Sequence, residues 1–417
     1  MLKANERTDK GKNKRSLGHY GHGIDAPWYE PRKLSETKRQ AFREMAQKSA
    51  RAKREALLGS DSLLVRPVNI PRLNPDLLMP QVERTGFRAL SLFSGGGGLD
   101  IGFDRAGFEH VASYEIVTGA AETLRLNRPN WKVFGGEEGD VSRVDWKKYR
   151  GCVDVVHGGP PCQPFSSAGR QNGHNDERNL FPEFVRAVRT IKPQAFVAEN
   201  VRALGLSKFR CFLTDQVLDP LSKEYRVYTF ELRAPDFGVP QVRTRFFIFG
   251  INRSLRTEYL PPRSTHYSDH LRSGFNRNLF AQGSMDRRVE PCMGARQALG
   301  LTDIGFDALA PTLRSGLTGP RHTTSILSSV SALKRWSELQ IWPNGVASDR
   351  EQAARYIPDN GHLRLAVADC AILQGFSESW QISGPVYVAI GQIGNSVAPP
   401  VAYHLARSIS EALFSTF

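Results

Sequence analysis

The chain has 417 residues, of which 40% are hydrophobic and 24% are charged. This length predicts at least two domains, each with a hydrophobic core of its own. No apolar run approaches the roughly 20 residues that span a membrane, and the amino terminus lacks the apolar core of a secretory signal. These features exclude an integral membrane protein and predict a soluble protein of the cytoplasm.

The five cysteines include no Cys-x-x-Cys pair, which argues against a disulfide framework and against structural zinc. We therefore expect a reducing compartment and no bound metal. Cys152, Cys211, Cys292 and Cys370 are expected to be ordinary buried thiols, because none has a setting that suggests reactivity. Cys162 differs from them.

The formal net charge of +14 predicts a polyanionic partner. Residues 1–60 hold 15 Lys and Arg against 7 Asp and Glu, so +8 of this charge lies near the amino terminus. The segment includes a predicted basic helix over about residues 35–58, and a proline-spaced stretch follows over residues 65–80. We interpret residues 1–88 as an appended basic extension, which either contacts phosphates or is a solvated leader without specific contacts.

The first predicted element of the folded part is a strand near residue 90 that runs into a glycine-rich loop and then a helical pattern. This order is typical of the first βα turn of a nucleotide-binding sheet. Glu115 follows Gly95 by 20 residues, at the end of the next predicted strand, where an acid can bind ribose hydroxyls.

The glycines do not fit a strict G-x-G-x-x-G, because Asp100 or Ile101 stands in the third position, and no Gly-Lys-Ser/Thr follows. A cofactor with an adenosine but no pyrophosphate, such as S-adenosylmethionine, therefore fits better than a dinucleotide. A tight turn without a ligand stays the alternative for this loop.

Cys162 stands in the segment Gly-Gly-Pro-Pro-Cys-Gln-Pro-Phe, residues 158–165. It follows an apolar run, residues 153–156, that predicts a buried strand, and open α/β sheets place their chemistry at the carboxyl ends of strands. The prolines restrict the backbone on both sides, so the direction of the sulfur is fixed. We interpret Cys162 as a nucleophile rather than a structural thiol.

Two later segments place charged side chains on predicted strands. Glu199 lies at the end of an apolar strand over residues 196–201. Arg243 and Arg245 occupy alternate positions of the segment 240–250 and therefore one face of another strand. A surface ion pair would explain each segment alone, but four such elements in order indicate one site.

With these elements in place, the sequence resembles the DNA cytosine-5 methyltransferase family of the bacterial modification type, over about residues 89–417. The matching motifs, in chain order, are the loop at 93–99, Glu115, Gly-Asp-Val at 139–141, Pro-Pro-Cys-Gln at 160–163, Glu-Asn-Val at 199–201, Gln-x-Arg-x-Arg at 241–245, Arg-Leu at 364–365 with Leu-Gln-Gly-Phe at 373–376, and Gly-Gln-Ile-Gly-Asn-Ser-Val at 391–397. Asp369 departs from the Glu that is usual there. Ala168 departs from the small polar residues common in the mobile loop, which leaves loop contacts to DNA open.

The resemblance implies an α/β fold with a doubly wound, mainly parallel sheet of the Rossmann-like, S-adenosylmethionine-dependent type. Residues 89–251 and 392–417 would form the catalytic, cofactor-binding domain, and residues 252–391 the small domain with the target recognition region. All ten basic side chains between 252 and 330 are Arg. Since Arg can bond guanine bidentately, this bias suits major-groove reading, although a compositional preference also explains it.

The resemblance also assigns site residues. Catalysis would depend on Cys162, Glu199, Arg243 and Arg245. The expected cofactor contacts are Phe93, Gly95, Gly97, Gly98, Leu99, Glu115, Ile116, Asp140, Val141, Pro161, Asn395 and Ser396. The expected DNA contacts are Ser166, Gln171, Arg178, Gln241, Thr312 and Leu313, with the Thr-Leu pair beside the extruded base.

The expected chemistry follows from the poor nucleophilicity of cytosine carbon-5. The Cys162 thiolate would add to carbon-6, which requires that its ordinary pKa of about 8.5 be lowered by a nearby Arg or by its strand-end setting. Glu199, protonated or sharing a proton with ring N3, would offset the charge on the ring, which requires a raised carboxyl pKa. Arg243 and Arg245 would hold the base and its phosphate, and the cytosine would be flipped out of the duplex.

Four alternative functions are weighed against this one. An exocyclic-nitrogen methyltransferase would need an Asp/Asn-Pro-Pro-Tyr/Phe motif, which the chain lacks. A cytosine-5 enzyme for transfer RNA shares the catalytic motifs, although the small domain and basic extension favour DNA. A non-enzymatic relative would be expected to lose Cys162 or Glu199, and a nicotinamide oxidoreductase conflicts with the missing third glycine. We therefore expect a monomer that binds double-stranded DNA in the bacterial cytoplasm, as part of a restriction-modification system.

Overall fold

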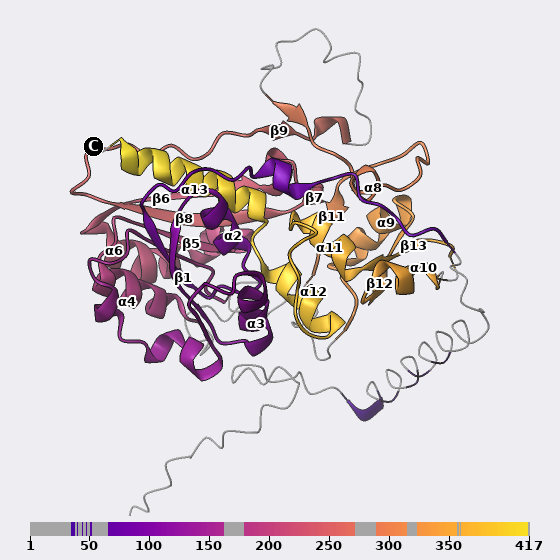
Figure 1. Ribbon diagram of the computed structural model, residues 1–417, viewed down its shortest axis with the longest axis horizontal. Helices are drawn as coiled ribbons and strands as arrows, with labels where there is room; N and C mark the ends of the chain where they lie inside the picture. Colours follow the sequence, from indigo (N-terminus) through magenta and orange to yellow (C-terminus); the bar gives the residue numbers. More distant parts are fainter. Residues whose placement is uncertain are drawn as a thin grey trace, which may run out of the picture.

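The computed structural model describes residues 66–161, 179–271, 289–314, 323–356, 358 and 360–415, together with a few positions between 35 and 51. Cys162 and the predicted DNA contacts Ser166, Gln171 and Arg178 lie outside the described residues, as does most of the basic extension. Figure 1 shows a large lobe built on a sheet and, beside it, a small lobe of short elements.

Within the described residues, seven strands form the main sheet of the large lobe, in the order β3-β2-β1-β4-β5-β8-β6. Strand β8 is antiparallel to its neighbours β5 and β6, and the other pairings in this sheet are parallel. The strands are β1 (Arg88–Leu92), β2 (Glu109–Glu115), β3 (Val133–Gly135), β4 (Val155–Gly158), β5 (Ala195–Val201), β6 (Tyr225–Arg233) and β8 (Thr244–Asn252).

Helices cover both faces of this sheet, because alternate strand residues are apolar on both sides. Val155 and Val197 pack in one hydrophobic core with α2 (Gly98–Arg105) and α13 (Pro399–Phe414). Val156 and Phe196 pack in the opposite core with α4 (Phe181–Ile191) and α5 (Arg210–Leu213). The large lobe also contains α3 (Thr118–Asn127) and α6 (Asp219–Ser222). The prediction of a doubly wound, mainly parallel sheet is confirmed.

Helix α13, from the carboxyl end of the chain, packs directly on α2, which lies near the start of the folded part (Figure 1). Two glycines of α2 allow this approach. A Cβ at Gly98 would lie 2.1 Å from the carbonyl oxygen of Val397, and one at Gly102 would lie 2.4 Å from the Cβ of Ala402. The helices are therefore in backbone contact, and the segment just before α13 is held beside the loop that precedes α2.

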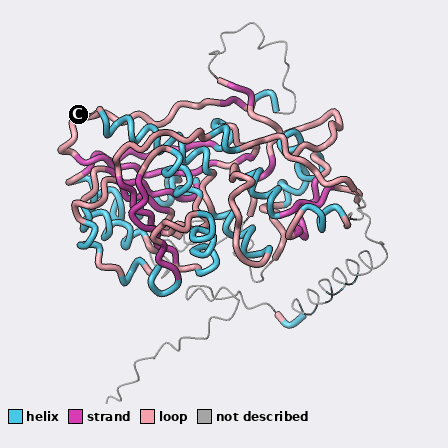
Figure 2. Tube along the Cα trace, viewed as in Figure 1, coloured by secondary structure: helices cyan, strands magenta, loops and turns pink. Residues whose placement is uncertain are grey.

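The small lobe consists of short elements connected by loops, as the tube in Figure 2 shows. They are β9 (His266–Tyr267), β10 (Glu290–Pro291), α8 (Ala295–Ala298), β11 (Ala310–Pro311), α9 (Val330–Glu338), β12 (Ile341–Ala347), α10 (Arg350–Ala354), β13 (Leu363–Ala366) and α11 (Val367–Gln374). Strand β11 pairs with β7 (Gln241–Val242), and α12 (Val386–Asn395) leads back to the large lobe. The domain boundaries given above remain a prediction.

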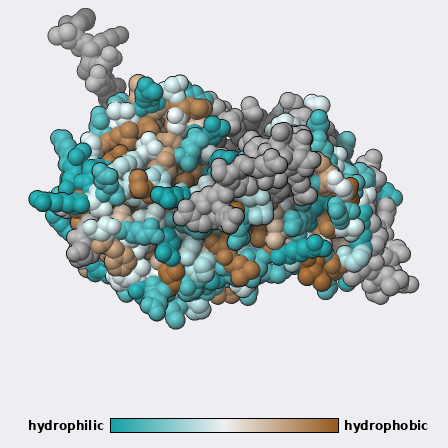
Figure 3. Space-filling view, turned by 90° about the horizontal axis from the view of Figure 1, so that it is seen from above, coloured by the Kyte–Doolittle hydropathy of each residue, from teal (hydrophilic) through white to brown (hydrophobic). Residues whose placement is uncertain are grey.

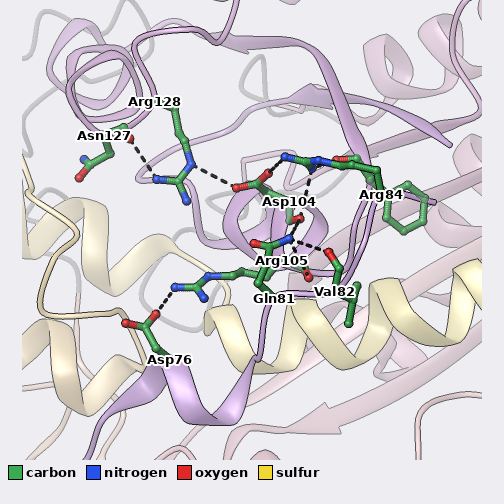
Figure 4. A network of polar contacts seen from close by, with 9 residues as sticks. Asp76, Gln81, Val82, Arg84, Asp104, Arg105, Asn127 and Arg128 are labelled. Atoms are coloured by element: carbon green, nitrogen blue, oxygen red, sulfur yellow. Dashed lines mark hydrogen bonds and ion pairs between the residues drawn. The ribbon is translucent and has the colours of Figure 1, made fainter. Parts of the chain in front are cut away.

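Residues 66–87, which we call the strap, run along both lobes before entering β1 (Figure 1). In the small lobe, the Arg66 backbone donates to the carbonyl of Ala354, and the Asn69 side chain donates to Asp369. Farther along, Asp76 forms an ion pair with Arg105 at the end of α2. Figure 4 shows this pair among neighbouring polar contacts of the large lobe. The strap therefore connects the small lobe to α2.

Exposed apolar side chains of the described surface include Ile70, Leu77, Leu206 and Leu260. In Figure 3 polar and apolar residues are interspersed over the described part of one face. Scattered exposure of this kind is ordinary for a folded protein. Among the helices of the described residues, none is both long and apolar enough to span a membrane.

The prediction for the four other cysteines was half wrong. Cys292 and Cys370 are buried, and burial raises the pKa of the Cys292 thiol to about 12. Cys152 and Cys211 are exposed. Cys152 lies in the turn before β4, and Cys211 faces outward from the short helix α5, so neither lies on a strand that would bury it.

Replacing Gly102 by alanine tests the contact between α2 and α13. The added methyl group would overlap backbone atoms of Ala402 and Tyr403 at 2.5 Å, so the two helices would have to separate. We expect a loss of about 1–3 kcal/mol in the free energy of unfolding, measured by denaturant titration. Gly119→Ala is the matched control, because its methyl group would approach Val388 only to 3.5 Å and alanine favours the helix. Equal losses in both variants would contradict this account of the packing.

Candidate active site

Several of the predicted catalytic and cofactor residues lie at one edge of the main sheet. Strands β1, β2, β4 and β5 are parallel, so their carboxyl ends meet at the same edge. Leu92 of β1 lies opposite Tyr114 of β2 and Gly158 of β4. The glycine loop, Glu115, the Pro160-Pro161 segment and Glu199 therefore emerge side by side.

The four glycines of the loop after β1 have different surroundings. Gly97 and Gly98 face protein, and a Cβ at Gly96 would lie 3.2 Å from Ser396 Oγ. At Gly95, which has φ +56°, a Cβ would meet nothing within 4 Å. Of the four, Gly95 is therefore the one beside which a ligand has room. Its positive φ favours glycine at this position, whereas packing does not require it.

Phe93 also has a left-handed backbone, with φ +55°, although it carries a bulky side chain. Such a conformation is rare for an aromatic residue and costs of order 1 kcal/mol. It lies between the last residue of β1 and the glycines, so the chain turns sharply as it leaves the sheet. The unusual backbone conformation of Phe93 therefore occurs in the predicted cofactor loop.

Glu115 fixes this loop with its carboxylate. Oε2 accepts the Gly95 N–H at 2.6 Å, and Oε1 accepts the Val117 N–H at 2.7 Å. The carboxylate is buried, which raises its pKa, whereas the two backbone donors lower it. Each oxygen can accept a further bond, so these contacts leave capacity for the predicted ribose hydroxyls.

The other predicted cofactor residues are placed in three ways. Leu99 and Val141 lie in the hydrophobic cores on opposite sides of the sheet. The Asp140 side chain accepts the Ser142 N–H at 3.0 Å. The remaining members lie near the sheet edge. Ser396 is buried, Asn395 is exposed, and the other three are partly exposed: Phe93, Ile116 and Pro161. Their contacts with a cofactor remain a prediction.

Glu199 and Arg245 form an ion pair across the antiparallel strands β5 and β8. Arg245 Nε lies 2.8 Å from Glu199 Oε1, with side chains 14% and 8% exposed. Burial raises the pKa of the Glu199 carboxyl, while the Arg245 and Arg243 guanidinium groups lower it. The net direction is upward, so the Glu199 carboxyl holds a proton more readily than an exposed carboxyl does.

Glu199 also adjoins the segment that precedes Cys162. A methyl group built on Gly159 would lie 3.1 Å from Glu199 Oε2, and the Asn200 side chain donates to the carbonyl of Pro160 at 3.0 Å. Cys162 is two residues farther along the chain, outside the described residues. The predicted nucleophile thus follows directly on a segment that is fixed beside the predicted acid.

Arg243 connects β8 to the carboxyl-terminal segment. Its Nη2 donates to the carbonyls of Gly394 and Ser396, at 2.9 and 2.6 Å, and the residue is 2% exposed. The positive charge therefore lies among backbone carbonyls, close enough to lower the pKa of Glu199. The contact with base or phosphate that was assigned to Arg243 remains a prediction.

Gln241, predicted to contact DNA, has no exposed surface in this structure. Its Nε2 donates to the carbonyl of Leu373 and to Gln374 Oε1, and its Oε1 accepts the Leu313 N–H. Leu313 is 2% exposed, while the Thr312 hydroxyl donates to the carbonyl of Val242. The structure brings these three predicted residues together at β7 and β11, and it leaves their DNA contacts as a prediction.

Three residues that were given no role by the motifs support this site. Asn200 positions Pro160, and Gln374 donates to the Ser396 carbonyl at 2.8 Å. Trp380 donates its indole N–H to the Gly96 carbonyl at 3.1 Å. Asn200 and Gln374 lie within the matched motifs, and this position could have indicated that they support the site. No spacing in the sequence relates Trp380 to Gly96.

Comparisons with known proteins agree with these observations. The family model described as C-5 cytosine-specific DNA methylase matches residues 87–411. The type II methyltransferase M.NgoMIV of Neisseria gonorrhoeae is 32% identical over 329 residues, which cover 78% of this chain and 98% of that protein. The type II methyltransferase M.Eco47II of Escherichia coli is 30% identical, with coverage of 80% and 81%.

One solved structure, a DNA modification methyltransferase encoded within a prophage of Escherichia coli, superposes with a TM-score of 0.51. It is 22% identical and covers 79% of this chain and 100% of its own. At this identity the likeness supports the fold alone.

Replacing Arg245 by methionine tests the electrostatics of Glu199. The substitution leaves a buried carboxyl without its ion-pair partner, which costs about 3–5 kcal/mol when the carboxyl is charged. An acid whose folded pKa lies above its unfolded pKa loses stability as the pH rises between the two values. We therefore expect the loss of melting temperature, relative to the wild type, to be larger at pH 8 than at pH 5.

Arg202→Met is the matched control, because Arg202 pairs with Glu231 through side chains that are 68% and 39% exposed. Exposed pairs contribute about 0–1 kcal/mol, so this variant should melt close to the wild type at both pH values. A loss in Arg245→Met that does not depend on pH would contradict the interpretation of Glu199.

Proposed function

The chain belongs to the C-5 cytosine-specific DNA methylase family, and we propose that it modifies one cytosine within a specific DNA sequence as the methyltransferase of a restriction-modification system. The observation that carries this proposal is the geometry at Glu199. A buried carboxyl with a raised pKa pairs with Arg245 and adjoins the segment that leads into Cys162. Those are the groups that methylation of carbon-5 requires.

S-adenosylmethionine supplies the activated methyl group when it is bound. The residues at the sheet edge fit an adenosine-containing cofactor: Gly95 faces open space, and the Glu115 carboxylate has remaining acceptor capacity for ribose hydroxyls. Asn395 is exposed beside them, and Ser396 packs on Gly96. We propose that this group of residues holds the cofactor.

In the proposed mechanism, Cys162 adds to carbon-6 of the flipped cytosine, which makes carbon-5 nucleophilic. Glu199 shares a proton with ring N3, so negative charge does not build up on the ring. Arg245 orients the Glu199 carboxyl through its bond at 2.8 Å. After methyl transfer, a base removes the proton from carbon-5 and the thiolate leaves carbon-6, which restores the aromatic ring and the free enzyme.

The proposed setting is the bacterial cytoplasm, where the chain would act as a monomer on duplex DNA. Its mechanism uses a thiol and a carboxyl and requires no metal ion. Among the described residues, no group of His, Cys, Asp or Glu is arranged to hold one. The all-Arg segment between 252 and 330 is the proposed reading region.

The first test compares the incorporation of labelled methyl from S-adenosylmethionine into duplex DNA and into transfer RNA. We expect labelled 5-methylcytosine at one sequence in the DNA, located by sequencing of the modified sites, and none in the RNA. Incorporation only into transfer RNA would establish the alternative substrate, because that class of enzyme shares the catalytic motifs.

The second test traps the covalent step. Fluorine at carbon-5 cannot be removed as a proton, so the Cys162 sulfur cannot leave after methyl transfer. Duplex DNA with 5-fluorocytosine at the target should give a denaturation-resistant adduct with the wild type and none with Cys162→Ser. Cys211→Ser is the control and should form the adduct normally, since Cys211 is exposed on α5. An adduct whose peptide maps to Cys152 or Cys211 would refute the assignment of the nucleophile.

A further inference from the structure

The loop between α11 and α12 contacts helix α3 and the glycine loop that precedes α2. We call residues 377–383 the brace. Its Gln381 N–H and Ser383 N–H donate to Asn127 Oδ1 and Thr123 Oγ1 on α3, each at 2.9 Å. Helix α3 begins just after Glu115, and α2 begins just after the glycine loop. The brace is thus fixed to the large lobe next to the cofactor residues.

Trp380 is the part of the brace that reaches the glycine loop. It is 6% exposed, and its indole N–H donates to the Gly96 carbonyl at 3.1 Å. A Cβ at Gly97 would lie 2.9 Å from Cζ2 of the same indole ring. The ring therefore occupies the space beside Gly97, and its polar atom restrains the preceding peptide.

Further contacts hold the Trp380 ring and the turn that carries it. The Arg128 guanidinium lies over it at 5.2 Å from the ring centre and is anchored by Asp104 Oδ2 at 3.1 Å. At the start of the brace, the Ser377 hydroxyl donates to Asp76 of the strap at 2.8 Å. The backbone of the turn closes through the bond from the Trp380 N–H to the Ser377 carbonyl.

A run of four glycines has unusual backbone freedom, and every bound cofactor would have to order it. External restraints that order the loop beforehand reduce this entropic cost of binding. Glu115 restrains the loop at Gly95 from one side. Trp380 restrains Gly96 and Gly97 from the other side, on a segment that no catalytic motif includes.

We propose that Trp380 is a positioning residue for the cofactor: its indole ring and N–H hold Gly96 and Gly97 in the conformation that receives S-adenosylmethionine. The inference rests on the proposed function, since it assumes that the glycine loop binds this cofactor. It predicts that loss of Trp380 weakens cofactor binding while the chemical step, once the cofactor is bound, proceeds at nearly the same rate.

The test measures binding of S-adenosylhomocysteine to the full chain by isothermal titration calorimetry. Trp380→Phe keeps an aromatic ring and removes the hydrogen bond, so we expect the dissociation constant to rise about 3- to 10-fold. Trp380→Leu removes the ring as well and should weaken binding further. In steady state, the KM for S-adenosylmethionine should rise in both variants, with kcat and the affinity for DNA nearly unchanged.

Trp131→Phe is the matched control. Trp131 stacks on the other side of the same network, with its ring centre 5.6 Å from the Arg128 guanidinium and a stacking contact to His110. This variant should melt at a temperature similar to that of Trp380→Phe but bind S-adenosylhomocysteine as the wild type does.

The outcomes separate the two proposals. A wild type that binds no S-adenosylhomocysteine overturns the proposed cofactor site and this inference with it. Wild-type binding together with unchanged binding in Trp380→Phe overturns the inference alone. Equal weakening in Trp131→Phe and Trp380→Phe also overturns it, because general loosening of the fold would then be the cause.

Discussion

The close contact between α2 and α13 is the constraint on which the arrangement of the site depends. Gly98 and Gly102 have no side chain, so backbone meets backbone, and the segment before α13 is held against the glycine loop. The carbonyls of Gly394 and Ser396 then face inward, where Arg243 donates to both of them. A steric feature of one short helix thus places residues that are about 300 positions later in the chain.

The antiparallel direction of strand β8 determines where the charge of Arg245 lies. In an otherwise parallel sheet, each strand presents its carboxyl end at the active edge. Arg245 stands at the amino end of β8, opposite Val201 of β5, so only an antiparallel strand brings it to that edge beside Glu199. The reversal of one strand therefore supplies the cation that orients a buried acid.

Two buried acids at this edge are stabilised differently. Glu115 accepts hydrogen bonds from neutral backbone donors, whereas Glu199 has a guanidinium partner and a free side toward Gly159. Burial raises both pKa values. Glu115 thereby fixes the glycine loop, whereas Glu199 keeps one carboxylate oxygen directed toward Gly159, as the proposed proton exchange with a base would require.

Much of this site could be predicted from local sequence. The apolar runs located β1, β4 and β5, and the position of Glu115 at the end of β2 followed from its distance to the glycine loop. Contacts between distant segments could not be predicted in this way. The bond from Trp380 to Gly96 joins residues 284 positions apart, and it depends on the packing of α3, α12 and the strap together. Exposure of Cys152 and Cys211 likewise depends on how a turn and a short helix face solvent.

The strap gives a physical reason for Asp369, the position at which the last motifs depart from the usual Glu. Asp369 is fully buried and accepts hydrogen bonds from Arg350, from the Ala366 N–H and from Asn69 of the strap. The acid therefore joins α10, the start of α11 and the strap at one point. The Arg66 N–H donates to the carbonyl of Ala354 at the end of α10, so the strap begins at the small lobe. It then reaches the large lobe through the ion pair of Asp76 with Arg105, so the strap joins the buried acid of the small lobe to the helix that follows the glycine loop.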